Sequence, residues 1–327
     1  MVILKEEISN FNFRLLIPSL DLRKNFLPLG FFLIAFISFS ACSKDSLVDP
    51  VIVKSANQSA YATRIFDYQY GPGQHASLIS ASEKGNSFIG EPWLNGKSYT
   101  SLGGWGGYVI AGFDHAINNT NGPDIALYTQ PSVASEPGVV YVMADTNNDG
   151  LPNDGEWYEI KGSEYNHKET IHNYQVTYYQ PGTSGFVTWK DNQGKSGTLI
   201  PEFGTGSWWW AGYGEKSSVT FSGERLPDAY FNSSGDPNSP LWVVRTGLFN
   251  FGYAECYFNN DYNANLKANF LDISSAVDAN GLPANLKSIN FIKVQSSVFQ
   301  VAGWLNEVST EVSGAADIHL LDKNSYQ

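Results

Sequence analysis

Short apolar segments alternate with polar turns along most of the chain. The segments are rich in β-branched and aromatic side chains, and Gly, Pro, Asn and Asp separate them. No window of helical length keeps the repeat of about 3.6 residues that an amphipathic helix needs, and only "DISSAVDA" (272–279) could form one short helix. The pattern predicts strands at 107–113, 124–130, 138–144, 156–162, 174–180, 185–191, 217–223, 241–247, 289–295 and 306–312.

Many short strands joined by regular turns predict an all-β protein, and more specifically a single β-sandwich of the jelly-roll kind. Residues 61–320 should form this domain, because no repeat or linker interrupts them. Residues 42–60 are small and polar, so we expect a flexible tether there, and residues 321–327 should form a C-terminal tail.

A secretory signal peptide is expected at residues 1–41. A basic pair precedes an apolar run that is shorter than the roughly 20 residues needed to span a bilayer. The run ends in "FSAC", which resembles the lipobox where bacterial lipoproteins are cut and acylated, here at Cys42. The following "SKDS" (43–46) resembles a signal for export to the outer face of the outer membrane. The alternative is a conventional signal peptide followed by an incidental cysteine.

Composition narrows the class of protein. Of the 327 residues, 14% are aromatic and only 16% are charged, which is typical of a turn-rich secreted β protein. A net charge of −12 without basic runs argues against nucleic acid as a partner. There are two cysteines, so an acylated Cys42 leaves Cys256 without a disulfide partner. The fold must then be held by its core or by metal, and we expect Cys256 to be buried.

One stretch carries a metal-binding motif. Residues 145–156, "DTNNDGLPNDGE", fit the calcium loop D-x-[DN]-x-[DN]-G-x5-E at every specified position. Strand-like segments flank this loop instead of helices, so we expect Ca²⁺ to pin two strands into register. The alternative is a hairpin turn built by Asn, Asp and Gly. The expected ligands are Asp145, Asn147, Asp149, the carbonyl of Leu151, Asn153 and Glu156.

Three consecutive tryptophans, Trp208, Trp209 and Trp210, stand between glycines. In a strand, Trp208 and Trp210 would share one face, but the glycines favour a loop. Exposed in a loop, the indoles would form a flat platform for a sugar face or a planar ligand. The alternative is that all three pack in the core or cover a sheet edge. We expect Trp93 and Trp304 to be single aromatics of the core or rim.

Two further groups of acidic residues stand in turn-like segments. One contains Asp114 and Asp124, and the other contains Asp272, Asp278 and Asn280. We expect both groups to build turns, because Asp and Asn side chains bond to nearby backbone amides. A second cation is the alternative.

Catalytic signatures are sparse. The chain has no HExxH, no G-x-S-x-G and no phosphate-binding glycine loop. His167 and His172 lack a third ligand nearby in the sequence, which argues against zinc. A glycoside hydrolase needs two carboxylates that face each other across a cleft, which sequence alone cannot pair. Candidates are Glu202, Asp228, Glu255 and Glu307.

Several blocks of the chain resemble a family of Bacteroidota surface lipoproteins, often called simply cell surface proteins. Their motifs are "WGGYVIAGFDH", "SEPGVVYVMADTNNDGLPNDGEWYEIKGSEY" and "GWLNEVSTEVSG", and a further block covers residues 270–295. The resemblance covers most of 61–320 and implies an exported β-sandwich. Members of this family often lie among genes for outer-membrane uptake, including the uptake of cobamides (vitamin B12).

We therefore expect a surface-anchored, calcium-stabilised binding protein without enzymatic activity. It would capture a small molecule such as a cobamide, or a glycan, for an outer-membrane, TonB-dependent transporter. One rival function is a secreted glycoside hydrolase or lyase, and another is a structural or adhesive surface domain. A cleft with carboxylates about 5–10 Å apart would favour the hydrolase, whereas aromatic rings without paired acids would favour binding.

Overall fold

The computed structural model describes one compact unit of the chain, within Val48–Gln327. The predicted signal peptide, Cys42, most of the tether, Trp93 and Trp304 lie outside the described residues. Within the described part, no helix is long and apolar enough to cross a membrane. The described residues are 57–73, 83–92, 99–129, 135–182, 185–202, 206–257, 259–303 and 305–326.

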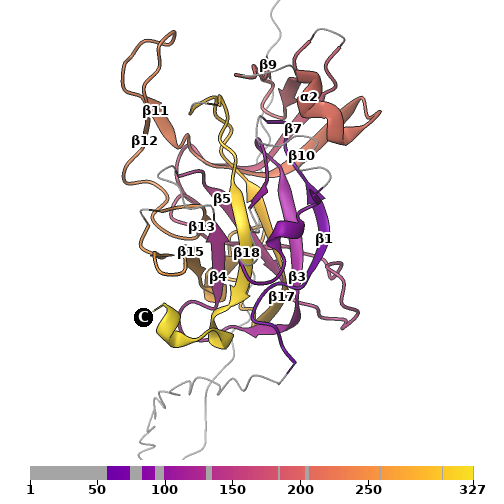
Figure 1. Ribbon diagram of the computed structural model, residues 1–327, viewed down its shortest axis with the longest axis vertical. Coiled ribbons are helices and arrows are strands. Elements are labelled where there is room, and N and C mark those ends of the chain that lie inside the picture. Colours follow the sequence, from indigo (N-terminus) through magenta and orange to yellow (C-terminus); the bar gives the residue numbers. More distant parts are fainter. Residues whose placement is uncertain are drawn as a thin grey trace, which may run out of the picture. The chain divides into compact units, whose positions relative to one another are not determined.

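Antiparallel sheets account for most of the regular secondary structure in this part, which confirms the prediction of an all-β sandwich (Figure 1). The described strands of the larger sheet are, in order, β1 (Arg64–Gln69), β3 (Tyr108–Asn118), β17 (Ser288–Ser296), β5 (Gly138–Met143), β6 (Tyr158–Ile160) and β16 (Ala276–Val277), with β13 (Tyr253–Ala254) paired to β5. Those of the second sheet are β14 (Tyr262–Asn263), β15 (Ala268–Leu271), β4 (Ile125–Thr129), β18 (Glu311–Asp317) and β2 (Thr100–Ser101).

An apolar core joins these two sheets. Strand alternation sends every second side chain into it, and each aliphatic side chain contributes about 1.5–3 kcal/mol when fully buried. The larger sheet contributes more of the core, because β17 lies between two long partners, β3 and β5. Fully buried members include Val109, Ala111, Leu127, Val142, Ile292, Val294, Val312 and Ala315.

A further sheet covers the other face of the larger sheet. Its described strands are β10 (Ser218–Arg225), β7 (Ile171–Tyr179), β8 (Thr188–Asp191) and β9 (Ser196–Thr198), in that order. Gln295 on β17 donates a hydrogen bond to the carbonyl of Ser222 on β10 at 3.1 Å. Phe221 packs edge-on against Tyr108 of β3, with ring centroids 6.5 Å apart. The alternation pattern predicted β7, β8 and β10 but neither β9 nor the separate layer that these strands form.

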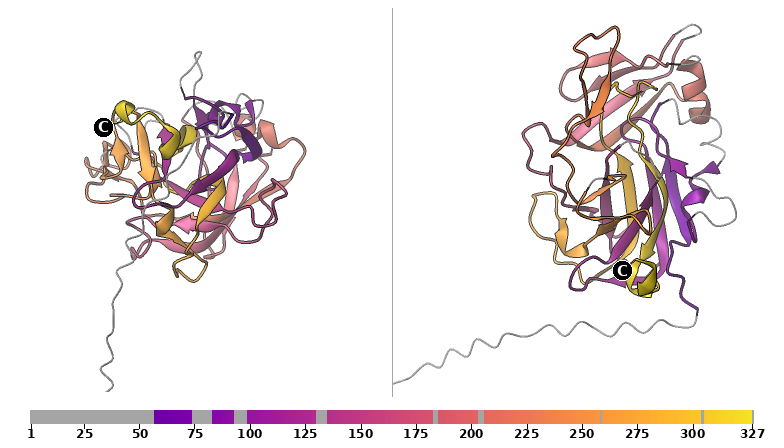
Figure 2. Two further views of the ribbon diagram at one scale, coloured as in Figure 1. Left: turned by 90° about the horizontal axis from the view of Figure 1, so that it is seen from below. Right: turned by 60° about the vertical axis from the view of Figure 1, so that its left-hand side comes forward.

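The parts outside these sheets are small. Strands β11 (Tyr230–Asn232) and β12 (Trp242–Val244) form a hairpin that projects beside the four-stranded sheet (Figures 1 and 2). The helical turns are η1 (Asn86–Phe88), α2 (Gly206–Trp210), η3 (Ala211–Tyr213), η4 (Ile273–Ser275), η5 (Ile318–Leu320) and η6 (Lys323–Ser325). The short helix expected at "DISSAVDA" is the single turn η4, which Asp272 caps by accepting a hydrogen bond from the Ser274 amide at 2.7 Å.

Each predicted strand overlaps an observed one, but the segment 306–312 does so only at its end. Strand β18 begins at Glu311. Asn306 has a left-handed φ of 60°, which breaks the extended conformation. Thr310 then donates its hydroxyl to the carbonyl of Glu136 at 2.9 Å. This segment therefore forms a loop between the sheets rather than the start of a strand.

The two acidic groups build turns and connections. Asp124 is completely buried and accepts hydrogen bonds from the amides of Thr120 and Ile273 at 2.9 and 3.0 Å. Asp278 accepts hydrogen bonds from the amides of Asn280 and Leu282, both at 2.9 Å. These two carboxylates thus satisfy backbone donors, as the sequence predicted, whereas Asp114 lies within strand β3 rather than in a turn.

His115 joins β3 to the end of β18. Its Nδ1 lies 2.7 Å from Asp114 and its Nε2 lies 3.0 Å from Asp317, and the imidazole is almost fully buried. The hydrogen bond to Asp317 raises the pKa of His115, and the bond to Asp114 adds to this, while burial opposes it. The protonated imidazole therefore stabilises the folded state.

We expect His115→Gln to destabilise the protein more at low than at high pH. The His115 contribution is fully present below the unfolded pKa of about 6.5 and is lost as pH rises through the raised folded pKa. A hydrogen bond to a charged group contributes about 1.5–3 kcal/mol. Near pH 6 we therefore expect the unfolding free energy of His115→Gln to be lower than that of the unmodified protein by an amount of this order. Urea unfolding of both proteins across pH measures it. His167→Gln serves as the control, and an equal pH dependence in both variants would contradict this account.

Candidate functional site

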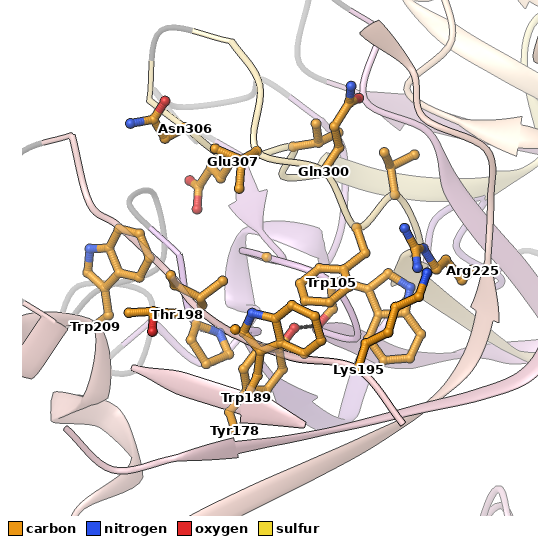
Figure 3. A pocket seen from close by; sticks show the side chains of 18 residues that line it. Trp105, Tyr178, Trp189, Lys195, Thr198, Trp209, Arg225, Gln300, Asn306 and Glu307 are labelled. Carbon is orange, nitrogen blue, oxygen red and sulfur yellow. Dashed lines mark hydrogen bonds between the residues drawn. The ribbon is translucent and has the colours of Figure 1, made fainter. Parts of the chain in front are cut away.

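A cleft of about 220 Å³ opens where the four-stranded sheet meets the loop that precedes β18. Aromatic side chains form its floor and walls, and polar side chains stand at its rim (Figure 3). Figure 3 shows Arg225 and Lys195 on one side, with Asn306 and Glu307 across from them. The aromatic lining consists of Trp105, Tyr178, Trp189, Trp209 and Phe299.

The aromatic rings support one another. Phe299 packs edge-on against Trp189 at a centroid distance of 4.8 Å and lies 6.2 Å from Trp105. The Trp105 indole donates a hydrogen bond to the carbonyl of Glu224 at 3.2 Å, which holds the floor in place. Trp189 is only partly buried, so part of its surface is open to a ligand. A ring that enters the cleft therefore meets surfaces that are already ordered.

A glycine allows Trp189 to lie flat at the cleft wall. Gly197 on β9 is the register partner of Trp189 on β8. A Cβ at Gly197 would lie 2.8 Å from the Trp189 indole, closer than real contacts allow. Only glycine at position 197 therefore lets the strand backbone approach the Trp189 indole this closely.

The charged rim is positioned by aromatic and amide contacts. The Arg225 guanidinium lies over the rings of Tyr174 and Phe299, 5.3 and 5.7 Å from their centroids. Across the cleft, the Asn306 amide donates a hydrogen bond to Glu202 at 3.0 Å. The cleft thus offers a cation on one side and amide and carboxylate oxygens on the other, which suits a ligand with both acceptors and hydroxyl donors.

The tryptophan triplet forms a helical turn, not the strand or extended loop considered from the sequence. Successive residues of an α-helix point about 100° apart, so the three indoles do not share one face. Trp209 and Trp210 are buried, at 2% and 3% exposure, whereas Trp208 is 41% exposed. Trp209 lines the cleft, and Trp210 donates its indole hydrogen to the carbonyl of Lys216 at 2.9 Å. The three tryptophans therefore do not form the exposed platform that was one of the two alternatives from the sequence.

Several lining residues had no sequence signal. Trp105, Trp189, Arg225 and Phe299 are far apart in the chain and belong to unrelated-looking motifs. Trp189 lies in a predicted strand, where alternation marks it as facing a sheet surface but does not say which surface. Only the packing of the four-stranded sheet brings these residues together.

The predicted calcium loop, residues 145–156, connects β5 to β6. The amide of Asp149 donates to Asp145 Oδ1 and Asn147 Oδ1 at 3.2 and 2.8 Å, and Asn153 donates to Asp149 Oδ2 at 3.0 Å. Four of the predicted ligand side chains therefore converge. Gly150 has a φ of 72°, the left-handed turn that the sixth position of such a loop requires.

The other two predicted ligands lie differently. Glu156 accepts a hydrogen bond from the Ala279 amide at 2.7 Å, so its carboxylate faces the neighbouring 278–281 turn. Leu151 is exposed. The clustered carboxylate and amide oxygens match the hard ligands that Ca²⁺ prefers. Asp145, Asn147, Asp149 and Asn153 would hold the ion, and Glu156 would join them by leaving Ala279.

Of the carboxylates considered for hydrolysis, Glu307 lines the cleft and Glu202 lies beside it through Asn306. Glu255 instead lies in a buried cluster with Glu136 and Glu311, whose carboxylate oxygens lie within 4.8 Å of one another. Burial, followed by the charge of Glu311, raises the pKa values of Glu255 and Glu136. None of these three carboxylates is among the residues that line the cleft.

Comparison with known protein families finds no model that matches the chain, and comparison with curated proteins finds no match either. The function is therefore inferred from the geometry of the cleft and of the loop.

The burial of the triplet predicts different costs for three similar substitutions. Trp209→Ala and Trp210→Ala should each lower the free energy of unfolding by about 3–5 kcal/mol, because each leaves a cavity. Trp208→Ala should change it by about 0.5 kcal/mol or less, because the side chain is a surface one. Urea unfolding followed by circular dichroism measures all three. Equal losses in the three variants would show that the triplet packs differently.

Proposed function

We propose that the protein is a surface-anchored binding protein whose aromatic cleft captures one ring of a small molecule, such as a cobamide, or of a glycan. Acylated Cys42 would hold it at the outer membrane, where it would pass its ligand to a TonB-dependent transporter. The observation that carries the proposal is the cleft itself, whose lining combines the rings of Trp189 and Phe299 with the charged groups of Arg225 and Glu307.

The size of the cleft limits what enters it. Sites that enclose a drug-sized ligand measure about 300–1,000 Å³. The cleft, at about 220 Å³, is smaller, so it holds a single ring while the rest of a cobamide or glycan stays outside. Stacking on the indoles would supply most of the affinity, and the polar rim would orient the ring.

The polar groups favour binding over hydrolysis. Among the described residues that line the cleft, Glu307 is the one carboxylate, whereas glycoside hydrolysis needs two that face each other. Glu202 lies behind Asn306, so it is the residue on which the rival hydrolase function would depend. We therefore propose that no catalysis occurs in the cleft.

We also propose that Ca²⁺ binds the 145–156 loop and stabilises the β5–β6 connection. Its role would be structural, because none of these side chains lines the cleft.

Binding should depend on Trp189 and not on Trp208. Trp189→Ala and Phe299→Ala remove central ring contacts, which typically costs at least about 2 kcal/mol, or about thirtyfold in Kd. Trp208→Ala is the matched control, because this exposed tryptophan does not line the cleft. Isothermal titration with cobamides and a glycan panel measures the affinities.

Unchanged affinity in Trp189→Ala and Phe299→Ala, with normal folding, would place the binding site elsewhere. If the unmodified protein hydrolyses a glycan and both Glu307→Gln and Glu202→Gln lose this activity, the rival hydrolase function would be established instead.

A calcium-selective chelator should lower the Tm of the full chain. An ion that binds only the folded state stabilises it by about 2.7 kcal/mol at a hundred times its Kd. Asp149→Asn and Glu156→Gln should lose most of this sensitivity, whereas Asp272→Asn, which alters a helix cap outside the loop, should keep it. Identical melting with and without chelator in the unmodified protein would rule out Ca²⁺ as a stabilising ion.

A further inference from the structure

Glu159, His172 and Glu224 come together where the larger sheet meets the four-stranded sheet. Each offers a ligand atom, and these atoms lie within 4.8 Å of one another. His172 Nδ1 is 2.5 Å from Glu224 Oε2. Glu159 stands on β6, His172 on β7 and Glu224 on β10, so the cluster spans two sheets.

A β-bulge aims His172 at Glu224. The β7–β10 pairing runs regularly to Tyr174 opposite Gly223 and resumes at Ile171 opposite Arg225. Strand β7 therefore has an extra residue opposite Glu224, and Asn173 takes a left-handed φ of 54° there. Bulges of this kind redirect a side chain that would otherwise follow the sheet.

Tyr141 adds a buried polar group beside the cluster. It is the register partner of Glu159, so the two side chains share a face of the larger sheet. Its side chain is nine-tenths buried, and its hydroxyl lies near the backbone of Glu224 without a hydrogen bond of regular geometry in the described residues. The carboxylates of Glu159 and Glu224 both lie close enough to act on this hydroxyl electrostatically.

The carboxylates of Glu159 and Glu224 are largely buried and are not paired with a lysine or arginine in the described part of the chain. Glu159 is buried, and the side chain of Glu224 is only 12% exposed. In the described part of the chain, no lysine or arginine forms an ion pair with either of them. The charge of Lys161 acts on Glu159 without forming an ion pair, and its ammonium lies 4.8 Å from the Tyr165 ring centroid. The ammonium of Lys293 lies 5.0 Å from the Tyr141 ring centroid. Burying two carboxyl groups side by side is costly, and a divalent ion bound by both would offset that cost.

We propose that Glu159, His172 and Glu224 bind one divalent transition-metal ion, for which Zn²⁺ is the best fit. Zinc accepts imidazole and carboxylate ligands at about 2.0–2.2 Å in a tetrahedral arrangement, which places the ligand atoms roughly 3.4 Å apart. The observed cluster needs only small side-chain shifts to reach that spacing. His172 is 41% exposed, so the fourth position opens to solvent and would take water.

The metal would tie the cleft-bearing sheet to the sandwich. Glu159 belongs to the larger sheet, whereas His172 and Glu224 belong to the four-stranded sheet. The carbonyl of Glu224 also accepts the hydrogen bond from Trp105 in the cleft floor. The sequence argued against zinc at His172 because its third ligand is absent nearby, and the fold supplies two carboxylates from distant strands.

Titration of the full chain with Zn²⁺, in excess Ca²⁺ to occupy the 145–156 loop, tests the proposal by calorimetry. We expect one site, and at least about a tenfold weaker Kd in His172→Gln and in Glu224→Gln, since even the loss of an outer-shell partner costs that much. The control is His167→Gln, which alters a histidine five residues before His172. This variant should bind Zn²⁺ as the unmodified protein does. Visible absorption of Co²⁺ should likewise appear in the control and be lost in His172→Gln.

No Zn²⁺ binding by the unmodified protein, or unchanged affinity in both folded ligand variants, would overturn the proposal. If one variant fails to fold, Glu159→Gln takes its place, and circular dichroism checks the folding of each. The result is independent of the cleft, because Trp189→Ala should retain Zn²⁺ binding even where it loses the organic ligand.

Discussion

Strand β17 forms hydrogen bonds to β3 on one side and to β5 on the other, and the rest of the structure depends on this central position. Its side chains must alternate between two covered faces. Ile292 and Val294 enter the core of the sandwich, while Lys293 and Gln295 face the four-stranded sheet. One strand therefore determines that one face of the larger sheet is apolar and that the other is polar but still covered.

The polar face has to satisfy its buried groups. Gln295 does so with two hydrogen bonds, to the carbonyls of Gly106 and Ser222. Lys293 lies between the rings of Tyr108 and Tyr141, and burial lowers its pKa to about 8. Burial also raises the pKa of Glu159 to about 9, with the charge of Glu224 adding to the shift. Covering this face therefore creates the buried cluster of ionisable groups for which we propose a metal ion.

The cleft is a consequence of the same covering. The four-stranded sheet lies over β3 and β17 through an aromatic interface, and its β8–β9 side extends toward the loop before β18. Rings that pack between the layers, such as Trp105 and Tyr178, are buried, whereas Trp189 at the margin stays partly open. The proposed binding site and the proposed metal site thus lie on either side of β10, with Arg225 facing the first and Glu224 the second.

The sequence by itself determined the features whose residues are close together along the chain. Strand alternation located β3, β5 and β17, and the spacing of 145–156 brought the side-chain oxygen atoms of Asp145, Asn147 and Asp149 together within one loop. Only the tertiary structure decided that Trp209 and Trp210 are buried and that Trp189 meets Phe299. It also decided that His172 meets Glu159 and Glu224. The physical reason is that alternation encodes which side of a strand is buried, whereas the partner on that side depends on pairings between strands far apart in the chain.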